Sequence, residues 1–419
     1  MARGSRGHRA EQGHQSSDGL AGHLDGATAM RATRTRQGPP RAILIAAAPA
    51  GPPTTTGADE PWDAESSLEE LSRLATTAGI EPVRSVSQRL RSPHPRTYLN
   101  EGKAQYVAEL MRAEECELVL ADDELSPAQQ KGLEAVCGAG TVVDRTALIL
   151  EIFGQRARTH EGMLQVRLAQ ARYGLPRLAR LWTHLERQRG GTGTRGGAGE
   201  TQLETDRRQI RARITKLERE LEGVRRARAT QRAKRRDIGH GVALVGYTNA
   251  GKSTLLNRLT RGGVKAEDKL FATLDPTTRQ WSVGGESLLL TDTVGFIHKL
   301  PAGLVAAFRA TLEELNEADL LLHVVDASSP HALGQAEVVL DELATLGTTA
   351  PVLTVFNKVD LLPAEERAAR LAALWDRFPD GVAVSAATGE GADLLAVRAA
   401  NIVHGRAERL PAVAAAGIG

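Results

Sequence analysis

Residues 246–253 read Gly-Tyr-Thr-Asn-Ala-Gly-Lys-Ser, a set of residue types and a spacing that suit a loop wrapped around phosphate groups. The apolar run 242–245 precedes this loop and Thr-Leu-Leu at 254–256 follows it, so the order strand, loop, helix is expected. Gly246 and Gly251 let the backbone approach an anion without a Cβ in the way, and successive N–H groups would point at it. This context favours a phosphate loop over the alternative, a chance match in a glycine-rich chain.

Two side chains of this loop could act on a nucleoside triphosphate. Lys252 would bring a positive charge to the β- and γ-phosphates, and Ser253 would offer a hydroxyl to Mg²⁺. The rest of the loop would contribute mainly backbone contacts. The expected nucleotide contacts in and beside the loop are Gly246, Tyr247, Thr248, Asn249, Ala250, Gly251, Lys252, Ser253 and Thr254.

A second short motif could complete the magnesium site. Asp292 and Gly295 form a D-x-x-G sequence after an expected hairpin, whose strands are 279–283 and 287–290. The Asp292 carboxylate could hold Mg²⁺ through water. Gly295 would let a backbone N–H turn towards the γ-phosphate.

Two motifs at the ends of later apolar strands indicate which base is bound. Asn357, Lys358 and Asp360 belong to an N-K-x-D sequence. The Asp360 carboxylate can accept hydrogen bonds from both N1–H and the exocyclic amine of guanine, a donor pair that adenine lacks. Ser385 and Ala386 follow the last predicted strand, where their backbone would meet the guanine oxygen. Each motif is weak alone, but four in this order, each at a strand end, predict an enzyme that hydrolyses GTP to GDP and phosphate.

The elements that must position these motifs predict an α/β protein with several parts. Residues 240–404 would form a P-loop GTPase domain, a mostly parallel sheet with helices on both faces. Residues 41–154 alternate strand and helix, which predicts a smaller N-terminal α/β domain with a parallel sheet. Residues 1–40 have few large apolar side chains and are expected to be a disordered tail, and residues 405–419 a short C-terminal tail.

The N-terminal domain shows two candidate helix starts and no catalytic constellation. Ser66 and Glu69 have the spacing of a capping box, and Ser126 with Pro127 is typical of a cap followed by a first-turn proline. Residues 98–103 could form a phosphate-contacting loop, but an ordinary strand-to-helix turn is the favoured interpretation.

Residues 155–236 have the pattern of an antiparallel helical hairpin. Apolar residues recur at alternating spacings of three and four across 164–185 and again across 210–224, as in the seam between two helices. Pro176 is expected to kink or interrupt the first arm. A glycine-dense stretch, 190–199, separates the arms and would make a tip suited to close approach to RNA, with a flexible linker as the alternative.

Charge is distributed unevenly along the chain. Residues 155–236 contain 22 Lys and Arg against 8 Asp and Glu, a net charge of +14. The whole chain carries +2, so the remainder carries −12. A basic segment on a nearly neutral protein indicates a polyanionic partner for that segment.

Composition also bounds where the protein acts. Cys116 and Cys137 lack metal-type or C-x-x-C spacing, which favours a reducing cytoplasm over a disulfide scaffold. No apolar run approaches about 18 residues, so no membrane span is expected, and the N-terminus lacks the apolar segment of a secretory signal. We expect a cytoplasmic monomer.

With these motifs in place, the chain resembles the HflX family, GTPases related to Obg that associate with the ribosome. The resemblance implies an N-terminal α/β domain, a helical hairpin and a GTPase domain. It also implies binding to the large ribosomal subunit and its rRNA, with subunit splitting and rescue of stalled ribosomes under stress. It covers residues from about 41 to 390 and rests on Asp144-Arg145-Thr146 and on the segments 156–162, 182–191, 200–208 and 271–279.

The resemblance completes the expected site. By motif match, Thr273 would sense the γ-phosphate and Mg²⁺, with Phe271 beside it as a further nucleotide contact. Phe296 stands where many GTPases place a water-orienting Gln, so unassisted hydrolysis should be slow. Asn249 could help hold K⁺ beside the phosphates, with capping of the loop as the equal alternative. The expected catalytic residues are Lys252, Thr273 and Gly295, and the expected Mg²⁺ ligands are Ser253, Thr273 and Asp292.

Two rival functions remain open from the sequence. A GTP-dependent scaffold could bind a protein partner through the hairpin, and salt dependence would separate it from an RNA-binding factor. An ATP-driven P-loop enzyme is disfavoured by Asp360.

Overall fold

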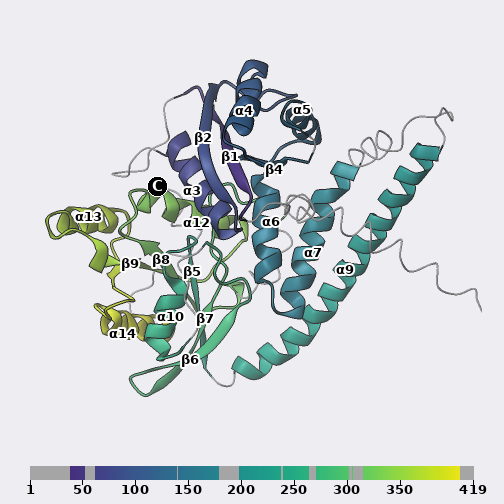
Figure 1. Cartoon of the computed structure of the whole chain (residues 1–419). Coiled ribbons are helices and arrows are strands. Elements are labelled where there is room, and N and C mark those ends of the chain that lie inside the picture. Colours follow the sequence, from purple (N-terminus) through teal and green to yellow (C-terminus); the bar gives the residue numbers. More distant parts are fainter. Residues whose placement is uncertain are drawn as a thin grey trace, which may run out of the picture.

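The structure, a computed structural model, describes residues 38–51, 62–138, 140–178, 198–236, 239–263, 270–301, 304 and 315–405. These residues build a four-stranded sheet unit, a pair of packed helices and a six-stranded sheet unit (Figure 1). We call these parts the N-terminal unit, the stalk and the C-terminal unit. The described part of the chain has no helix that is both long and apolar enough to cross a membrane.

The N-terminal unit alternates strands and helices, as the sequence predicts. Its four strands are all parallel and lie in the order β2-β1-β3-β4. The apolar strand β1 pairs with β2 on one side and β3 on the other, so its side chains are buried on both faces of the sheet. The elements are β1 (Arg41–Pro49), α3 (Ala64–Thr77), β2 (Glu81–Leu90), α4 (Glu101–Ala113), β3 (Leu118–Ala121), α5 (Pro127–Cys137), β4 (Val142–Asp144) and α6 (Arg145–Arg156).

One of the two predicted helix caps is wrong. Helix α3 begins at Ala64, and Asp63 caps it by accepting hydrogen bonds from the backbone N–H groups of Glu65 and Ser66, at 2.9 and 3.0 Å. Ser66 is thus inside the helix, because a carboxylate three residues earlier takes the cap position. The Ser126 cap is confirmed, and it forms a capping box with Gln129.

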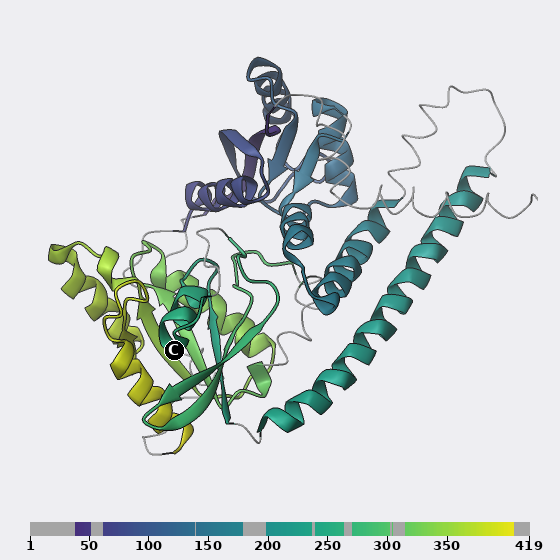
Figure 2. The same ribbon diagram turned by 60° about the horizontal axis from the view of Figure 1, so that its bottom comes forward.

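The stalk consists of helices α7 (His160–Gly174) and α9 (Ala198–Arg236), which lie side by side in both views (Figures 1 and 2). Leu164 shares an apolar cluster with Leu221, whereas Leu178 shares one with Ile210, so the helices run antiparallel as predicted. A 3₁₀ turn, η1 (Leu175–Arg177), contains Pro176 and interrupts the first arm. The predicted glycine tip lies outside the described residues except for its last two positions, which begin α9.

The C-terminal unit is the predicted mostly parallel sheet with helices on both faces. Its strands lie in the order β10-β9-β8-β5-β7-β6, and only the edge strand β6 is antiparallel to its neighbour. Helices α10 and α14 pack on one face, and α12 and α13 on the other. The elements are β5 (His240–Gly246), α10 (Lys252–Thr260), β6 (Thr277–Val283), β7 (Glu286–Asp292), β8 (Leu320–Asp326), α12 (Ala332–Thr345), β9 (Val352–Asn357), η2 (Val359–Leu361), α13 (Ala364–Arg377), β10 (Val382–Ala383) and α14 (Ala392–Val403).

The two sheet units share one core. A single cluster of buried apolar side chains contains Leu44 of β1 and Val245 of β5, and it continues through Phe153 of α6 and Phe271. Because apolar side chains of both units pack in this one cluster, their relative orientation is tied to the packing of both.

A buried guanidinium lies at this contact. The Arg145 side chain is 1% exposed and donates to the carboxylates of Glu70 and Asp122, the latter at 2.7 Å. The same guanidinium donates to the backbone carbonyl of His298 in the C-terminal unit at 3.0 Å. Burial raises the pKa of Glu70, and the charge of Arg145 opposes that rise.

Arg145→Ala should lower the free energy of unfolding by about 3–5 kcal/mol, because the buried Glu70 and Asp122 carboxylates would lose the guanidinium that they share. Urea unfolding followed by circular dichroism measures this loss. Arg84→Ala is the matched control, since Arg84 pairs with Glu114 at 3.0 Å with 62% of its side chain exposed, and it should cost at most about 1 kcal/mol. Equal losses in the two variants would contradict a structural role for the buried pair.

Candidate nucleotide-binding site

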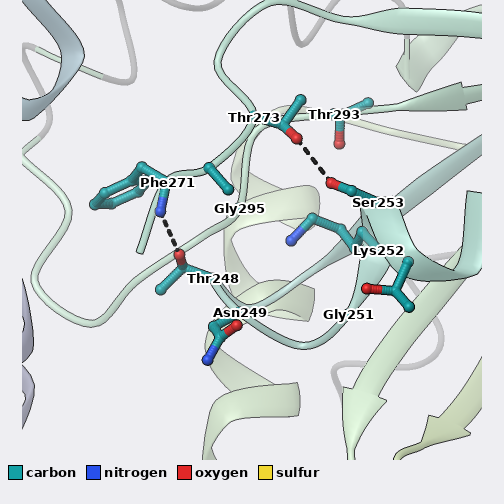
Figure 3. Close-up of a pocket in the computed structure, with 11 residues that line it drawn as sticks. Thr248, Asn249, Gly251, Lys252, Ser253, Phe271, Thr273, Thr293 and Gly295 are labelled. Carbon is teal, nitrogen blue, oxygen red and sulfur yellow. Dashed lines mark hydrogen bonds between the residues drawn. The ribbon is translucent and has the colours of Figure 1, made fainter. Parts of the chain in front are cut away.

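The predicted phosphate loop connects β5 to α10, at the carboxyl end of the central strand (Figure 3). Gly246 has φ +154° and Gly251 has φ +94°, values that favour glycine. A Cβ on Gly246 would lie 2.3 Å from the carbonyl oxygen of Val324, and one on Gly251 would lie 2.3 Å from the Asn357 amide nitrogen. Both glycines are therefore required by close approach as well as by backbone conformation.

A small cavity of about 50 Å³ lies at this loop. Predicted nucleotide contacts make up most of its lining, so the fold brings the loop, Phe271, Thr273 and Gly295 together. The lining residues are Thr248, Asn249, Gly251, Lys252, Ser253, Thr254, Phe271, Ala272, Thr273, Thr293 and Gly295.

The three predicted Mg²⁺ ligands converge. The hydroxyls of Ser253 and Thr273 lie 2.8 Å apart (Figure 3). Both hydroxyls donate to Oδ2 of Asp292, Ser253 at 2.6 Å and Thr273 at 2.9 Å. The other carboxylate oxygen of Asp292 is buried and has no hydrogen-bond partner among the described residues. Burial raises the pKa of Asp292, and the nearby Lys252 charge opposes that rise.

This donor set fits Mg²⁺, which prefers hard oxygen ligands and one or two carboxylates. Ser253, Thr273 and Asp292 would hold the ion, and an orphaned buried carboxylate oxygen is the group that a cation or its water would satisfy. When bound, Mg²⁺ supplies positive charge between the β- and γ-phosphates.

Lys252 is directed into the loop that it follows. Its ammonium group donates to the carbonyl oxygens of Gly246 and Tyr247, at 3.1 and 2.8 Å. Burial lowers the pKa of Lys252 to about 8, and the carboxylate of Asp292 opposes that effect. A phosphate beside this ammonium group would favour its charged form, and Gly295 lies close enough that an added Cβ would be 2.9 Å from it.

The D-x-x-G segment is paired with the phosphate loop through its backbone, a contact that no sequence motif signals. The N–H of Thr248 donates to the carbonyl of Phe296 at 2.6 Å, and the N–H of Phe296 donates to Gly246 at 3.1 Å. The Phe296 side chain is 1% exposed and packed in the shared core. An apolar ring offers no hydrogen bond with which to orient water.

The motifs that are predicted to read the base meet at the ends of β9 and β10. Asn357 donates to the carbonyl of Ala250 at 2.8 Å and accepts from the N–H of Ala386 at 3.0 Å, so it links the phosphate loop to the last motif. Asp360 is exposed in η2, and Ser385 is buried with its hydroxyl accepting from Thr388. This arrangement leaves the Asp360 carboxylate open to a base.

Sequence reasoning missed two supporting residues and did not foresee the contact that the side chain of a third makes. Asp326 ends β8 and accepts from the ammonium group of Lys358 at 2.6 Å, a position that its place at a strand end could have indicated. Arg258 donates to the carbonyl oxygen of Ala386 at 3.0 Å, and no local signal marks it. Tyr247 was predicted as a nucleotide contact, but its hydroxyl points away from the pocket and donates to Glu70 of the N-terminal unit.

Comparison with known proteins identifies the family. Three family profiles match: "GTP-binding GTPase N-terminal" over residues 65–154, "GTP-binding GTPase Middle Region" over 156–235 and "50S ribosome-binding GTPase" over 241–358. The GTPase HflX of Magnetococcus marinus is 50% identical over 366 residues, which cover 86% of this chain and 82% of that protein. The GTPase HflX of Escherichia coli is 49% identical over 329 residues, 77% of this chain and 76% of that one.

The chain belongs to the HflX family of GTPases. It therefore binds and hydrolyses GTP. Among solved structures, the SsGBP–GDP complex is similar in fold, with a TM-score of 0.50 and 22% identity over 88% of this chain and 99% of that chain. In this HflX-family chain, four separate strand ends come together at the candidate GTP pocket.

Asp360→Asn should lower GTP affinity by at least about 100-fold and raise affinity for xanthosine triphosphate, because the amide replaces an acceptor that guanine needs. Competition binding against a fluorescent nucleotide measures both changes. Asp380→Asn, at another exposed aspartate of the same unit, should leave both affinities unchanged. An unaltered preference for GTP in folded Asp360→Asn protein would show that this residue does not read the base.

Proposed function

We propose that this GTPase binds the large ribosomal subunit and its rRNA through the stalk, and that it splits or rescues stalled ribosomes under stress. The arginine-rich outer face of α9 carries the proposal. The family profile matched by residues 241–358, described as a ribosome-binding GTPase, supports the same assignment.

The outer face of α9 follows from helix geometry. Arg208, Arg219 and Arg226 are separated by 11 and 7 residues, so at about 100° per residue they project within about 20° of one another. Ile210 and Leu217, two residues of the buried seam, project about 160–180° away from that direction. All three arginines are exposed, so the stalk turns a basic ridge away from its own core.

A basic ridge suits a polyanion better than a protein groove. The described residues of α9 outside its seam are mainly charged or small, and their carboxylates pair along the helix, as Glu222 does with Arg226 at 3.2 Å. The rival function, a scaffold that docks a protein through the stalk, would call for an apolar face. Contacts with phosphate groups account for the exposed arginines and need no apolar face.

Replacing Arg208, Arg219 and Arg226 by Gln should weaken binding to large ribosomal subunits. The slope of log K against log salt should flatten by about 2–3, because each lost phosphate contact removes about 0.7–0.9 of slope. Co-sedimentation with purified subunits, with a non-hydrolysable GTP analogue bound, measures both effects across a salt series.

A control removes the same charge elsewhere. Arg73, Arg84 and Arg96 are exposed residues of the N-terminal unit, and their replacement by Gln should leave most of the salt slope in place. Equal flattening by both triple variants would assign the effect to net charge and contradict a stalk interface. GTP affinity should be the same in all three proteins.

We also propose that K⁺ accelerates hydrolysis in this chain. Asn249 has φ +62° and lies in the cavity lining, and a cation beside it would offset charge that develops between the β- and γ-phosphates. The buried Phe296 side chain cannot hydrogen-bond to the attacking water. A cation beside the phosphates would therefore supply stabilisation that this residue does not.

Hydrolysis by the isolated protein should be faster in K⁺ than in Na⁺ at equal ionic strength, by about tenfold or more. Phosphate release in the two salts measures the ratio. Asn249→Ala should bring the ratio close to one while GTP affinity changes little. Equal rates in both salts for the unmodified protein would refute the K⁺ proposal and leave acceleration to the ribosome.

A further inference from the structure

The loop that carries Thr273 touches the joint where the stalk begins. Asp275, two residues after Thr273, accepts hydrogen bonds from the backbone N–H groups of Arg158 and Thr159, at 2.9 and 3.0 Å. The hydroxyl of Thr159 donates to the same carboxylate. These residues form the connection between α6 and α7. The contact joins residues more than 110 positions apart in the sequence.

The carboxylate also lies at a helix start. Thr159 is the N-cap of α7, and its hydroxyl accepts from the N–H of Gly162 at 3.0 Å. A negative charge at this end of a 15-residue helix is favourable because the helix dipole is positive there. Gly162 leaves room for the contact, since a Cβ at that position would lie 2.4 Å from Oδ1 of Asp275.

A second contact holds the other end of the same loop. The Phe271 and Phe153 rings meet edge to face with their centroids 4.7 Å apart, and both side chains are 1% exposed. The N–H of Phe271 donates to the hydroxyl of Thr248 in the phosphate loop at 2.9 Å. Thr273 thus lies between two residues that are held by contacts. Phe271 packs against Phe153 of α6, the last helix of the N-terminal unit, and Asp275 accepts hydrogen bonds at the start of the stalk.

We propose that Asp275 is a positioning residue that ties the Thr273 loop to the base of the stalk. Through this tie the α6–α7 joint holds Thr273 beside Ser253 and Asp292. This coupling is reciprocal. If the Asp275 contact helps Mg²⁺–GTP to order the Thr273 loop, then Mg²⁺–GTP binding must stabilise the α6–α7 connection by the same free energy. The connection between α6 and α7, at Arg158 and Thr159, is therefore part of the GTPase machinery, independently of what the stalk binds.

Steady-state kinetics test this contact through substitutions at Asp275 and at the start of α7. Asp275→Ala should lower kcat about tenfold with KM changed less than about threefold, and should raise the Mg²⁺ concentration needed for half-maximal rate. Gly162→Ala keeps the carboxylate but displaces it, and should lower kcat about threefold. Gly223→Ala is the matched control on α9, where an added Cβ meets nothing within 4 Å, and it should leave kcat unchanged.

A double-mutant cycle isolates the contact. In an Asp275→Ala background, Gly162→Ala should have almost no further effect, because the added methyl no longer has a carboxylate to displace. Additive losses would show that the two residues act separately and would overturn the proposal. The cycle uses the full-length protein and needs no ribosome, so its outcome does not depend on the ribosome-binding proposal.

Hydrogen–deuterium exchange supplies a readout besides activity. Adding Mg²⁺ and a non-hydrolysable GTP analogue should slow exchange in the peptide that contains the N–H groups of Arg158 and Thr159. That nucleotide-dependent change should be lost in Asp275→Ala and retained in Gly223→Ala, while peptides of the phosphate loop respond in all three proteins. An equal nucleotide-dependent change in exchange at this peptide with and without the Asp275 carboxylate would overturn the proposal. The absence of any such change in the unmodified protein would do so as well.

Discussion

The arrangement of the two sheet units depends on the buried Arg145 guanidinium. A buried charge is tolerated only when it is paired and hydrogen-bonded, and here the partners come from both units: Glu70 and Asp122 on one side and the His298 carbonyl on the other. Glu70 in turn accepts from Tyr247, a residue of the phosphate loop itself. The N-terminal unit therefore sets the position of the nucleotide loop directly, through a chain of three hydrogen-bonded side chains.

The candidate GTP pocket shows how a parallel sheet gathers distant residues. Gly246, Asp292 and Asn357 end β5, β7 and β9, and Ser385 follows β10. Because parallel strands present their carboxyl ends at the same edge, residues up to about 140 positions apart in the sequence meet there. Backbone hydrogen bonds from the phosphate loop to Phe296 then close the edge around a small cavity. The stalk adds a second constraint, since its base holds the loop that supplies Thr273.

Much of this architecture could be predicted from short-range pattern. The glycine loop, the hairpin of β6 and β7, the strand–helix alternation before residue 154 and the heptad seam of α9 all follow from spacing along the chain. Local rules failed where two of them competed, as at α3, where Asp63 rather than Ser66 caps the helix. They were also silent on Arg258, whose side chain reaches across the sheet edge to the Ala386 carbonyl.

The sequence by itself determined which chemistry its motifs suit, because it supplies residue types that are fitted to phosphate, to a hard cation and to guanine. Those properties belong to residue types at fixed spacing beside a strand end, so each motif indicates its chemistry without reference to the rest of the chain. Only the tertiary structure decided that the Tyr247 hydroxyl donates to Glu70 and that Asp275 accepts hydrogen bonds from the backbone at the start of α7. Such contacts join segments with unrelated local patterns, and their energy exists only after packing has removed water and fixed both partners.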